Sequence, residues 1–351
     1  MIVAFDTETH LFRPGRMAPE IVCLTASVNG SPAEIFVGLQ ILELVRGWLD
    51  NGASLVGHNV AYDLACLCAA DETLIPKVFA AYEADLITDT MLRQKLADIG
   101  RGRYRGFANG PVWVPLAYDL GSVGRRHGVA VDKDAPWRMR YAELSGVPLA
   151  AWPEDAKAYA LRDAEATWAA YRGQDDRYPP ELLADQFNQA RKAWALHLTS
   201  VWGLRTSLRG VLQLEKGAIE ELDRLAELLE DSGLLRKDRS RDTKAAKARI
   251  VEVCEAQGLE PRLTKTGAIC LDSEACKASG DPILEAYADF TSYTKVLSSD
   301  VKMLKAGIFE PIHTRFDLAT TGRVTSSKPN VQNPRRLAGV RECFVPRGFQ
   351  E

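Results

Sequence analysis

The first 70 residues alternate between segments with the spacing of strands and segments with the spacing of helices. Short apolar or alternating runs predict strands, and apolar positions three or four residues apart predict helices. The predicted strands are residues 2–5, 20–28, 34–37 and 54–56, and the predicted helices are residues 39–49 and 61–70. An Asn29-Gly30-Ser31-Pro32 turn makes a hairpin of the second and third strands. This order predicts an α/β fold built on a mixed sheet.

The next part of the first half combines a loop insertion with helical patterns. Residues 100–118 are rich in Gly, Arg, Pro and aromatic side chains and are interpreted as a loop insertion. Helical spacing returns at residues 120–127 and 153–172. The sequence Tyr178-Pro179-Pro180 interrupts any regular element, so it predicts a domain boundary.

The second half has a different organisation. Residues 181–305 keep helical spacing almost throughout, with a basic and polar interruption at residues 236–249. From Pro311 onward, Gly, Pro, Asn, Ser and Arg dominate. A chain of 351 residues is expected to form two domains, or three.

Composition excludes several classes of protein. With 46% hydrophobic and 26% charged residues the chain can build a core, which excludes intrinsic disorder. No run of about 18 uncharged apolar residues exists, so no membrane span is expected. The opening residues lack a basic stretch before Asp6, which excludes a standard secretory signal. The seven cysteines form no Cys-x-x-Cys pair and are expected to be reduced cytosolic thiols.

The net charge of −3 argues mildly against a nucleic-acid-binding protein. The charge is unevenly distributed, however. Residues 1–178 hold 18 basic and 23 acidic side chains, whereas residues 179–351 hold 26 and 24. The last 41 residues hold seven basic side chains against three acidic ones. Positive charge is therefore available in the second half.

Three acidic motifs in the first half could carry chemistry. Asp6 and Glu8 come at the end of the first predicted strand, two positions apart, so strand geometry places them on one face. Asp63 falls on the first turn of a predicted helix. Tyr159 and Asp163 are four positions apart and share one face of a later helix. Two neighbouring carboxylates repel each other and need a cation or protons to coexist.

Each motif alone also has an ordinary structural explanation. Asp63 could serve only the dipole of its helix, and Tyr159 with Asp163 could be a partly buried hydrogen-bonded pair. His58, beside the second motif, is interpreted as a structural hydrogen-bonding residue. Asp89 is expected to cap the helix that follows it. The three motifs favour a functional site only in combination.

The order Asp-x-Glu, Asn-x3-Asp, Tyr-x3-Asp, on a strand, a helix start and a helix, resembles the exonuclease motifs of the DEDD superfamily, in its tyrosine subclass. The resemblance covers about residues 1–173. It implies a ribonuclease-H-like fold and digestion of nucleic acid from the 3′ end. It also implies that Tyr159 orients the attacking water and that Asn59 lines the site near the terminal nucleotide.

The same resemblance implies two divalent metal ions, Mg²⁺ or Mn²⁺, as cofactors. These ions prefer oxygen ligands, and a pair about 3.5–4 Å apart stabilises both the attacking and the leaving oxygen in phosphoryl displacement. By resemblance, Asp6 bridges both ions, Glu8 and Asp163 complete the ion on the nucleophile side, and Asp63 holds the second ion.

Residues 320–334 form the most distinctive segment. Their polar composition suits a loop that offers many hydrogen bonds to nucleic acid, or a solvated connector. The order Thr321-Gly322-Arg323, Ser326-Ser327, Pro329-Asn330, Gln332-Asn333 resembles the start of the palm in family A DNA polymerases. Arg341, Phe344 and Gly348 continue that resemblance. In the family this loop contacts the primer–template duplex, which implies contacts from Arg323, Ser326, Ser327, Asn330, Gln332, Asn333 and Arg341.

The family resemblance implies three domains: an exonuclease at residues 1–178, a helical thumb at 179–310 and the start of a palm at 311–351. The basic stretch, with seven basic against two acidic residues at 236–249, then lies in the thumb. Arg239 and Lys244 are its expected phosphate contacts, through counterion release. A solvated charged face is the alternative.

The sequence ends at Gln350-Glu351, before the position of the catalytic palm aspartate in that family. We therefore expect no polymerase activity from this chain alone, which would be a fragment or one half of a split polymerase. The expected partners are a single-stranded 3′ end, a primer–template duplex and a C-terminal polymerase half, with no membrane. The expected location is the cytoplasm of a bacterial or phage-infected cell.

Three functions follow from the sequence. The first is proofreading of DNA by a 3′–5′ exonuclease. The second is an RNA-processing exonuclease of the ribonuclease D type, in which the Thr-Gly-Arg and Gln-Asn signature has no place. The third is a non-catalytic, DNA-clamping half of a split polymerase, which is compatible with the first.

Overall fold

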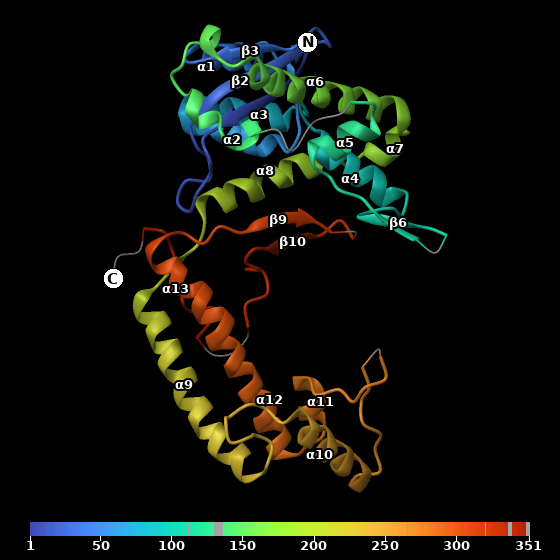
Figure 1. The fold of residues 1–351 in the computed structure, drawn as a ribbon, viewed down its shortest axis with the longest axis vertical. Helices are drawn as coiled ribbons and strands as arrows, with labels where there is room; N and C mark the ends of the chain where they lie inside the picture. Colours follow the sequence, from blue (N-terminus) through green and yellow to red (C-terminus); the bar gives the residue numbers. More distant parts are fainter. Residues whose placement is uncertain (111, 130–135, 265, 320, 336–338, 349–351) are drawn as a thin grey trace. The chain divides into compact units, whose positions relative to one another are not determined.

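The computed structural model describes residues 1–110, 112–129, 136–264, 266–319, 321–335 and 339–348 (Figure 1). The chain forms two compact units. Unit 1 consists of Met1–Gly203 and His313–Lys328, and unit 2 of Leu204–Ile312 and Pro329–Glu351.

Unit 1 is built on a five-stranded sheet with the order β3-β2-β1-β4-β5. The strands are β1 (Ile2–Thr9), β2 (Ile21–Val28), β3 (Glu34–Val37), β4 (Ser54–Gly57) and β5 (Ile87–Asp89). β2 runs antiparallel to β1 and to β3, whereas β4 runs parallel to β1 and β5 parallel to β4. The prediction of an α/β fold with a mixed sheet is confirmed.

The central strand β1 extends four residues beyond its predicted end. Apolar residues stop at Phe5, but pairing continues, with Asp6 opposite Thr25 and Glu8 opposite Cys23. Asp6 and Glu8 are half-buried while Thr7 between them is buried. The hydrophobic pattern therefore predicted only the apolar first half of β1 and not its polar second half.

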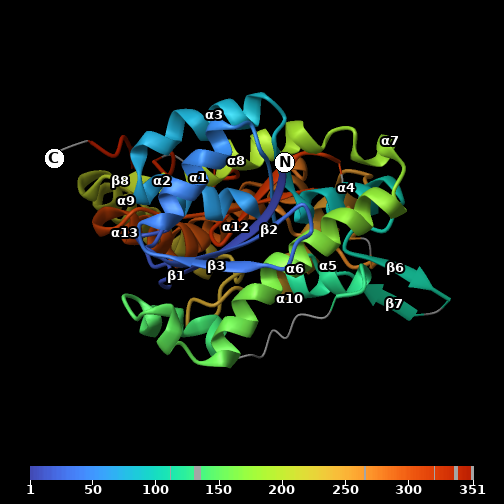
Figure 2. The same cartoon turned by 90° about the horizontal axis from the view of Figure 1, so that it is seen from above.

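Helices cover both faces of this sheet (Figure 2). They are α1 (Gln40–Asp50), α2 (Val60–Ala70), α3 (Ile75–Glu83), α4 (Thr90–Gly100), α5 (Leu120–Arg126), α6 (Glu154–Arg177), α7 (Pro180–Leu183) and α8 (Gln186–Trp202), with short 3-10 turns η1 (Glu72–Leu74), η2 (Pro136–Met139), η3 (Tyr141–Leu144) and η4 (Leu149–Ala151). One core joins Phe5 to α1, α2, α3 and α8. A second core joins Cys23 to α6 and the turns before it.

Residues 100–118 contain a β-hairpin, so their interpretation as a loop insertion was wrong in part. Strands β6 (Gly106–Asn109) and β7 (Val112–Pro115) pair antiparallel. Gly110 directly follows β6, and its φ of 60° suits the left-handed geometry of hairpin turns.

A second hairpin belongs to unit 1 although it lies far along the chain. Strands β9 (Arg315–Leu318) and β10 (Val324–Ser327) pair antiparallel. Leu204 and Ile312, which directly follow Gly203 and precede His313, pair with each other in an isolated bridge. The chain therefore leaves unit 1 and returns to it at adjacent points.

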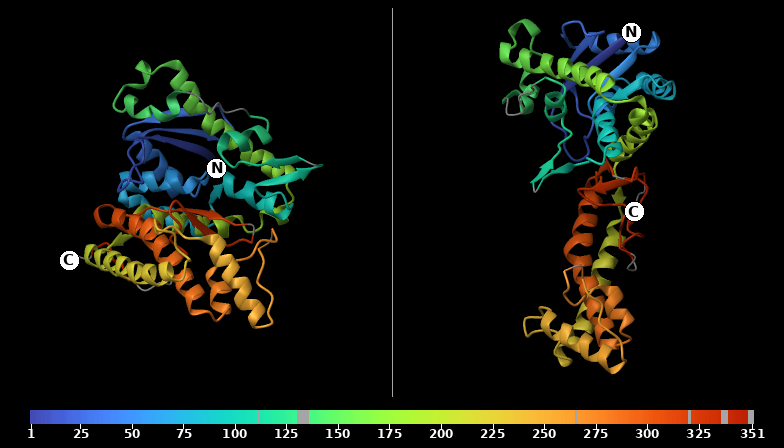
Figure 3. Two further views of the ribbon diagram at one scale, coloured as in Figure 1. Left: turned by 60° about the horizontal axis from the view of Figure 1, so that its bottom comes forward. Right: turned by 90° about the vertical axis from the view of Figure 1, so that its right-hand side faces the viewer.

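Unit 2 is mainly helical (Figure 3). Its elements are β8 (Arg205–Thr206), α9 (Leu208–Asp231), α10 (Thr243–Ala256), α11 (Ser273–Ala278), α12 (Pro282–Lys295), the π-helical segment η5 (Val296–Val301), α13 (Lys302–Phe309) and β11 (Phe344–Val345). The long helices α9 and α12 pack against each other. Helices at residues 181–305 are confirmed, but α10 occupies half of the predicted interruption at 236–249.

The predicted boundary at Tyr178 is a break between α6 and α7, and both α7 and α8 remain with unit 1. The assignment of exonuclease, thumb and palm to the three predicted segments stays a prediction. Within the described ranges, no helix is long and apolar enough to cross a membrane.

Candidate functional site

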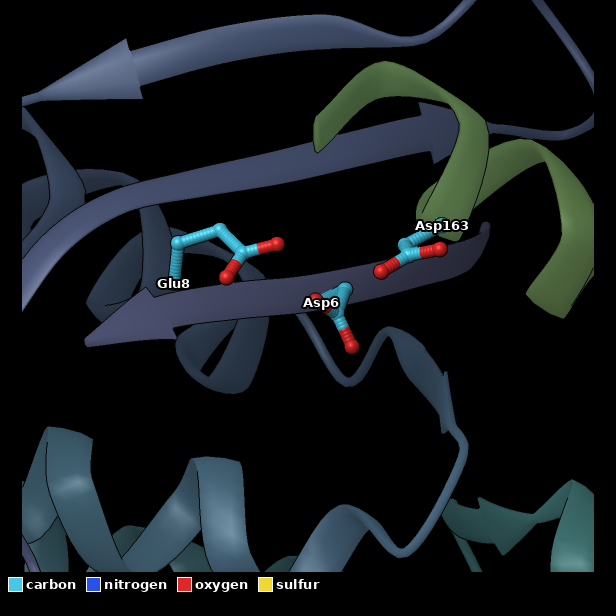
Figure 4. Close-up of side chains that lie close together, drawn as sticks. All are labelled: Asp6, Glu8 and Asp163. Carbon is cyan, nitrogen blue, oxygen red and sulfur yellow. The ribbon is translucent and has the colours of Figure 1, made fainter. Parts of the chain in front are cut away.

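Three acidic side chains meet on one face of unit 1. Ligand oxygens of Asp6, Glu8 and Asp163 all lie within 4.8 Å of one another (Figure 4). Asp6 and Glu8 come from β1 and Asp163 from α6. Asp163 is only 9% exposed. Among the described residues, these form the one group of three or more acidic, His or Cys side chains that could hold a metal ion.

Local sequence explains why the three carboxylates meet. The period of two along β1 directs Asp6 and Glu8 to the same face of the sheet. Helix α6 packs against β1 and β2 through Ala156 and Ala160, both fully buried. Such small side chains let the helix backbone lie close to the strands, which brings Asp163 to the two acids.

Burial and mutual repulsion oppose the charged forms of these acids. The pKa of Asp6 is raised well above its usual value by burial, then by the charges of Asp63, Asp163 and Glu8. Burial, Asp163 and Asp63 likewise raise the pKa of Glu8. Burial raises the pKa of Asp163 to about 7. Each carboxylate would gain from a neighbouring cation.

The donor set fits a divalent cation. The buried Oδ1 of Asp163 has no hydrogen-bond partner within the part of the chain that the structure describes. Buried polar atoms are rarely left unpaired, so this oxygen is available as a ligand. Carboxylate oxygens are the ligands that Mg²⁺ and Mn²⁺ prefer. Asp6, Glu8 and Asp163 would hold such an ion.

Asp63 lies close to this cluster but is turned toward β1. Its Oδ1 accepts hydrogen bonds from the backbone N–H of Thr7, at 3.1 Å, and from the Thr7 hydroxyl, at 2.5 Å. Asp63 is 3% exposed, and burial raises its pKa to about 7 although both Thr7 bonds act in the opposite direction. The structure therefore brings together three of the four predicted acids, and the fourth, Asp63 on α2, accepts hydrogen bonds from Thr7, which lies between Asp6 and Glu8.

Tyr159 lies on the helix that carries Asp163, and Asn59 precedes the helix that carries Asp63. Tyr159 lies one turn before Asp163 on α6, and burial, then the charges of Asp163 and Glu8, raise its pKa. Its phenol therefore stays protonated and can donate a hydrogen bond. Asn59 is exposed at the N-cap position of α2, with φ of 63°, and its backbone N–H donates to Asp89 at 3.1 Å.

One charged residue near the acids was not found from sequence. Arg138, an exposed residue of η2, lowers the pKa of Glu8 and of Asp163 through its positive charge, against the larger effect of burial. It lies more than twenty residues before Asp163, in a segment without periodic pattern. No sequence signal connected it with the acids.

The interpretations of His58 and Asp89 are confirmed. The ring nitrogens of His58 lie 2.9 Å from the Thr90 hydroxyl and 2.9 Å from the Tyr118 carbonyl oxygen. Asp89 caps α4 by accepting from the backbone N–H groups of Met91 and Leu92. The same carboxylate accepts from the backbone at the start of α2.

The predicted duplex-binding residues are divided between the units. Arg323 is exposed, and its carbonyl oxygen accepts from Ala319 N at 2.7 Å, which closes the β9–β10 hairpin. Ser327 is exposed on β10, but Ser326 is only 6% exposed. The other predicted contacts lie in unit 2 and are exposed: Asn330, Gln332, Asn333 and Arg341.

The two thumb residues differ in their surroundings. Arg239 forms ion pairs with Asp223, at 2.7 Å, and Glu230, at 3.2 Å. Lys244 is exposed at the start of α10, where Asp242 caps the helix. The charge of Arg239 is therefore already balanced within unit 2.

No family model and no curated protein matches the sequence. A solved structure does match: the POL domain of Pol1 from M. smegmatis, in complex with DNA primer-template and dNTP, with a TM-score of 0.61 and 16% sequence identity. The match covers 99% of this chain and 56% of that chain, so this chain spans little more than half of that domain's length. The fold is thus similar to that of a DNA polymerase domain.

Proposed function

We propose that this chain is a 3′–5′ exonuclease of DNA that belongs to a polymerase of family A. The observation that carries the proposal is the cluster of Asp6, Glu8 and Asp163, whose oxygens lie within 4.8 Å of one another. The proposed reaction hydrolyses the last phosphodiester bond at a 3′ end and releases a nucleoside monophosphate.

Two further observations support this function. The sheet order β3-β2-β1-β4-β5, with β2 antiparallel, is compatible with a ribonuclease-H-like fold, and two of the acids, Asp6 and Glu8, project from its central strand. The similar Pol1 domain was solved with a DNA primer-template, which supports DNA as the partner.

In the proposed mechanism, Asp6, Glu8 and Asp163 would hold divalent metal. Bound metal would supply charge stabilisation for the attacking and leaving oxygens. Asp63, held by Thr7, adds negative charge on the neighbouring side of β1. Tyr159, protonated and one turn from Asp163, donates a hydrogen bond that orients the attacking water. Arg138 is placed to balance negative charge that develops on the phosphate.

Duplex DNA would be bound by the β9–β10 hairpin through Arg323 and Ser327. Its neighbours in sequence, Asn330, Gln332, Asn333 and Arg341, are further proposed contacts. Lys244 is the thumb residue that remains available for a phosphate, whereas Arg239 would have to exchange its two carboxylate partners. Ser326 is proposed only as a buried support of the hairpin.

The decisive experiment removes the metal ligands. Asp6→Ala combined with Glu8→Ala should slow the digestion of labelled single-stranded DNA with Mg²⁺ by roughly 10³-fold or more, because several kcal/mol of transition-state stabilisation are lost. Comparing the wild-type rates on DNA and RNA of one sequence separates proofreading from RNA processing, since proofreading requires faster digestion of DNA.

The matched control is Glu165→Ala combined with Asp176→Ala, which removes two exposed carboxylates from α6. This control should keep the wild-type rate. Undiminished digestion by the Asp6 and Glu8 double variant would overturn the proposed function. A chain that binds primer–template but never digests DNA would instead be a clamping subunit.

A further inference from the structure

The β6–β7 hairpin and the segment before it form a surface that the proposed exonuclease chemistry does not use. Residues 99–118 contain three arginines and no acidic residue. Figure 2 shows the two strands extending away from the helices of unit 1. A surface with positive charge and aromatic rings suits nucleic acid, because phosphates pair with arginine and bases stack on rings.

Trp113 on β7 is the exposed ring of this surface. Its side chain is 62% exposed. The ring nevertheless packs closely against the backbone of Gly106 in the paired strand. A Cβ atom added at Gly106 would lie only 2.6 Å from the ring of Trp113. One face of the Trp113 ring therefore packs on Gly106, and the side chain remains largely open to solvent.

Two arginines in the segment before the hairpin are free of ion pairs with the described residues. The guanidinium carbon of Arg101 lies 5.7 Å from the centroid of the Tyr178 ring, and that of Arg103 lies 5.1 Å from the centroid of the Phe107 ring. Both are exposed, and neither forms an ion pair with another described residue. Stacking on rings limits the motion of both guanidinium groups without neutralising their charge.

The segment is fixed to the hairpin that carries Arg323. The Arg105 guanidinium lies 3.2 Å from Asp317 on β9, and the Tyr104 hydroxyl donates to the carbonyl oxygen of Leu318. The buried Lys95 of α4 also pairs with Asp317, at 2.7 Å. These contacts place the arginine segment next to the turn that presents Arg323.

We propose that the β6–β7 hairpin binds an unpaired nucleic-acid strand, with Trp113 as the stacking surface for a base and Arg101 and Arg103 as phosphate contacts. The proposal rests on nucleic acid being the substrate of this chain. It adds a binding site that is separate from the carboxylate cluster. An exposed ring favours an unpaired strand over a duplex, because only unpaired bases offer their faces for stacking.

The test measures the affinity of the full chain for fluorescein-labelled dT20 by anisotropy, with EDTA to prevent digestion. Trp113→Ala should weaken binding about 5- to 150-fold, the range of one base–aromatic stack. Trp113→Phe, which keeps an aromatic face, should restore most of the affinity. Arg103→Ala should reduce the slope of log affinity against log salt by about 0.7, the loss of one phosphate contact on a single strand.

The matched controls are Trp202→Ala, which removes a tryptophan that is 61% exposed, and Arg172→Ala, on the exposed side of α6. Both should bind dT20 like the wild type. Wild-type affinity and salt slope in Trp113→Ala and Arg103→Ala would overturn the proposal. An equal loss on a blunt 20-base-pair duplex would also overturn it, since it would show contact with paired DNA.

The exonuclease proposal is judged separately by the digestion rate of Asp6→Asn with Mg²⁺. If that variant digests DNA normally while Trp113→Ala loses dT20 affinity, the exonuclease assignment fails and the hairpin site stands. If Asp6→Asn is inactive while the hairpin variants bind dT20 normally, the exonuclease assignment stands and the hairpin site fails. A wild-type chain that does not bind dT20 contradicts the hairpin site directly.

Discussion

At the scale of single residues, the carboxylate cluster follows largely from sequence. The two-residue period of a strand places Asp6 and Glu8 on one face, and helical spacing places Tyr159 one turn before Asp163. The orientation of Asp63 could not be predicted, because it depends on the hydroxyl and N–H of Thr7, which reach it only through the tertiary fold. The position of Arg138 near the acids likewise depends on the tertiary fold and could not be predicted from sequence.

The raised pKa values of these acids predict how stability depends on pH. In the metal-free folded chain, Asp63 and Asp163 have pKa values of about 7, above those of the unfolded chain. Between about pH 4 and 7 the folded state therefore binds more protons than the unfolded state, and stability falls as pH rises through this window. Well above pH 7, Asp63 and Asp163 are charged in both states, and the destabilisation that these two residues cause is complete.

Thermal unfolding in EDTA from pH 4.5 to 8 measures this effect. Asp163→Asn removes one of the buried charges, so its melting temperature at pH 8 should exceed that of the wild type by at least roughly 2–4 °C, the shift for about 1 kcal/mol in a domain of this size. Mg²⁺ at pH 8 should stabilise the wild type and not the variant. A lower melting temperature of Asp163→Asn in EDTA at pH 8 would contradict the repulsion inferred here.

At the scale of elements, one carboxylate stabilises the starts of two helices. Asp89 accepts from four backbone N–H groups, those of Asn59, Val60, Met91 and Leu92. Asp89→Ala should therefore cost roughly 1–4 kcal/mol, twice the range of about 0.5–2 kcal/mol for one cap. Asp119→Ala, which removes the side-chain cap of the single helix α5, is the matched control. Urea unfolding that shows equal losses for both would exclude the double role.

Helices and strands with a long hydrophobic pattern were predicted well. Short strands that pair only within a hairpin, and polar helix starts, were predicted poorly. Ala160 and the other alanines of α6 gave a clear helical face. The β6–β7 hairpin was missed because each strand has only four residues and faces solvent on much of its surface, so alternation is weak. The start of α10 was missed because Thr243 and Lys244 are polar, while the cap from Asp242 fixes the helix.

At the scale of the whole molecule, unit 1 is discontinuous in sequence. Lys95 is buried, and its partner Asp317 belongs to the second segment, His313–Lys328. A chain that ends at Gly203 should therefore be destabilised by roughly 3–5 kcal/mol relative to the complete unit, the cost of removing one partner from a buried pair. Trp194 of α8, stacked on Tyr82 at 5.4 Å, explains why the unit continues to Gly203 and not to the predicted boundary at 178.

The measurement compares the thermal stability of residues 1–203 with that of the same segment joined by a short linker to residues 313–328. A short linker suffices because Leu204 and Ile312 are paired. The joined chain should melt at a higher temperature, and Lys95→Met should raise the stability of the shorter chain by removing its unpaired charge. Equal melting temperatures for the two chains would show that the second segment adds nothing to unit 1.

The pairing of Lys95 with Asp317 also sets an order of events during protein synthesis. All of Leu204–Ile312 must be made after Gly203 before the second segment of unit 1 exists. At about 5–20 residues per second, this takes roughly 5–20 s, far longer than helices and hairpins need to form. During that interval α4 has every neighbour from the first segment but lacks the counter-charge of Lys95. Unit 1 of the nascent chain therefore stays incomplete during this interval, and it is completed when β9 has been synthesised and pairs Asp317 with Lys95.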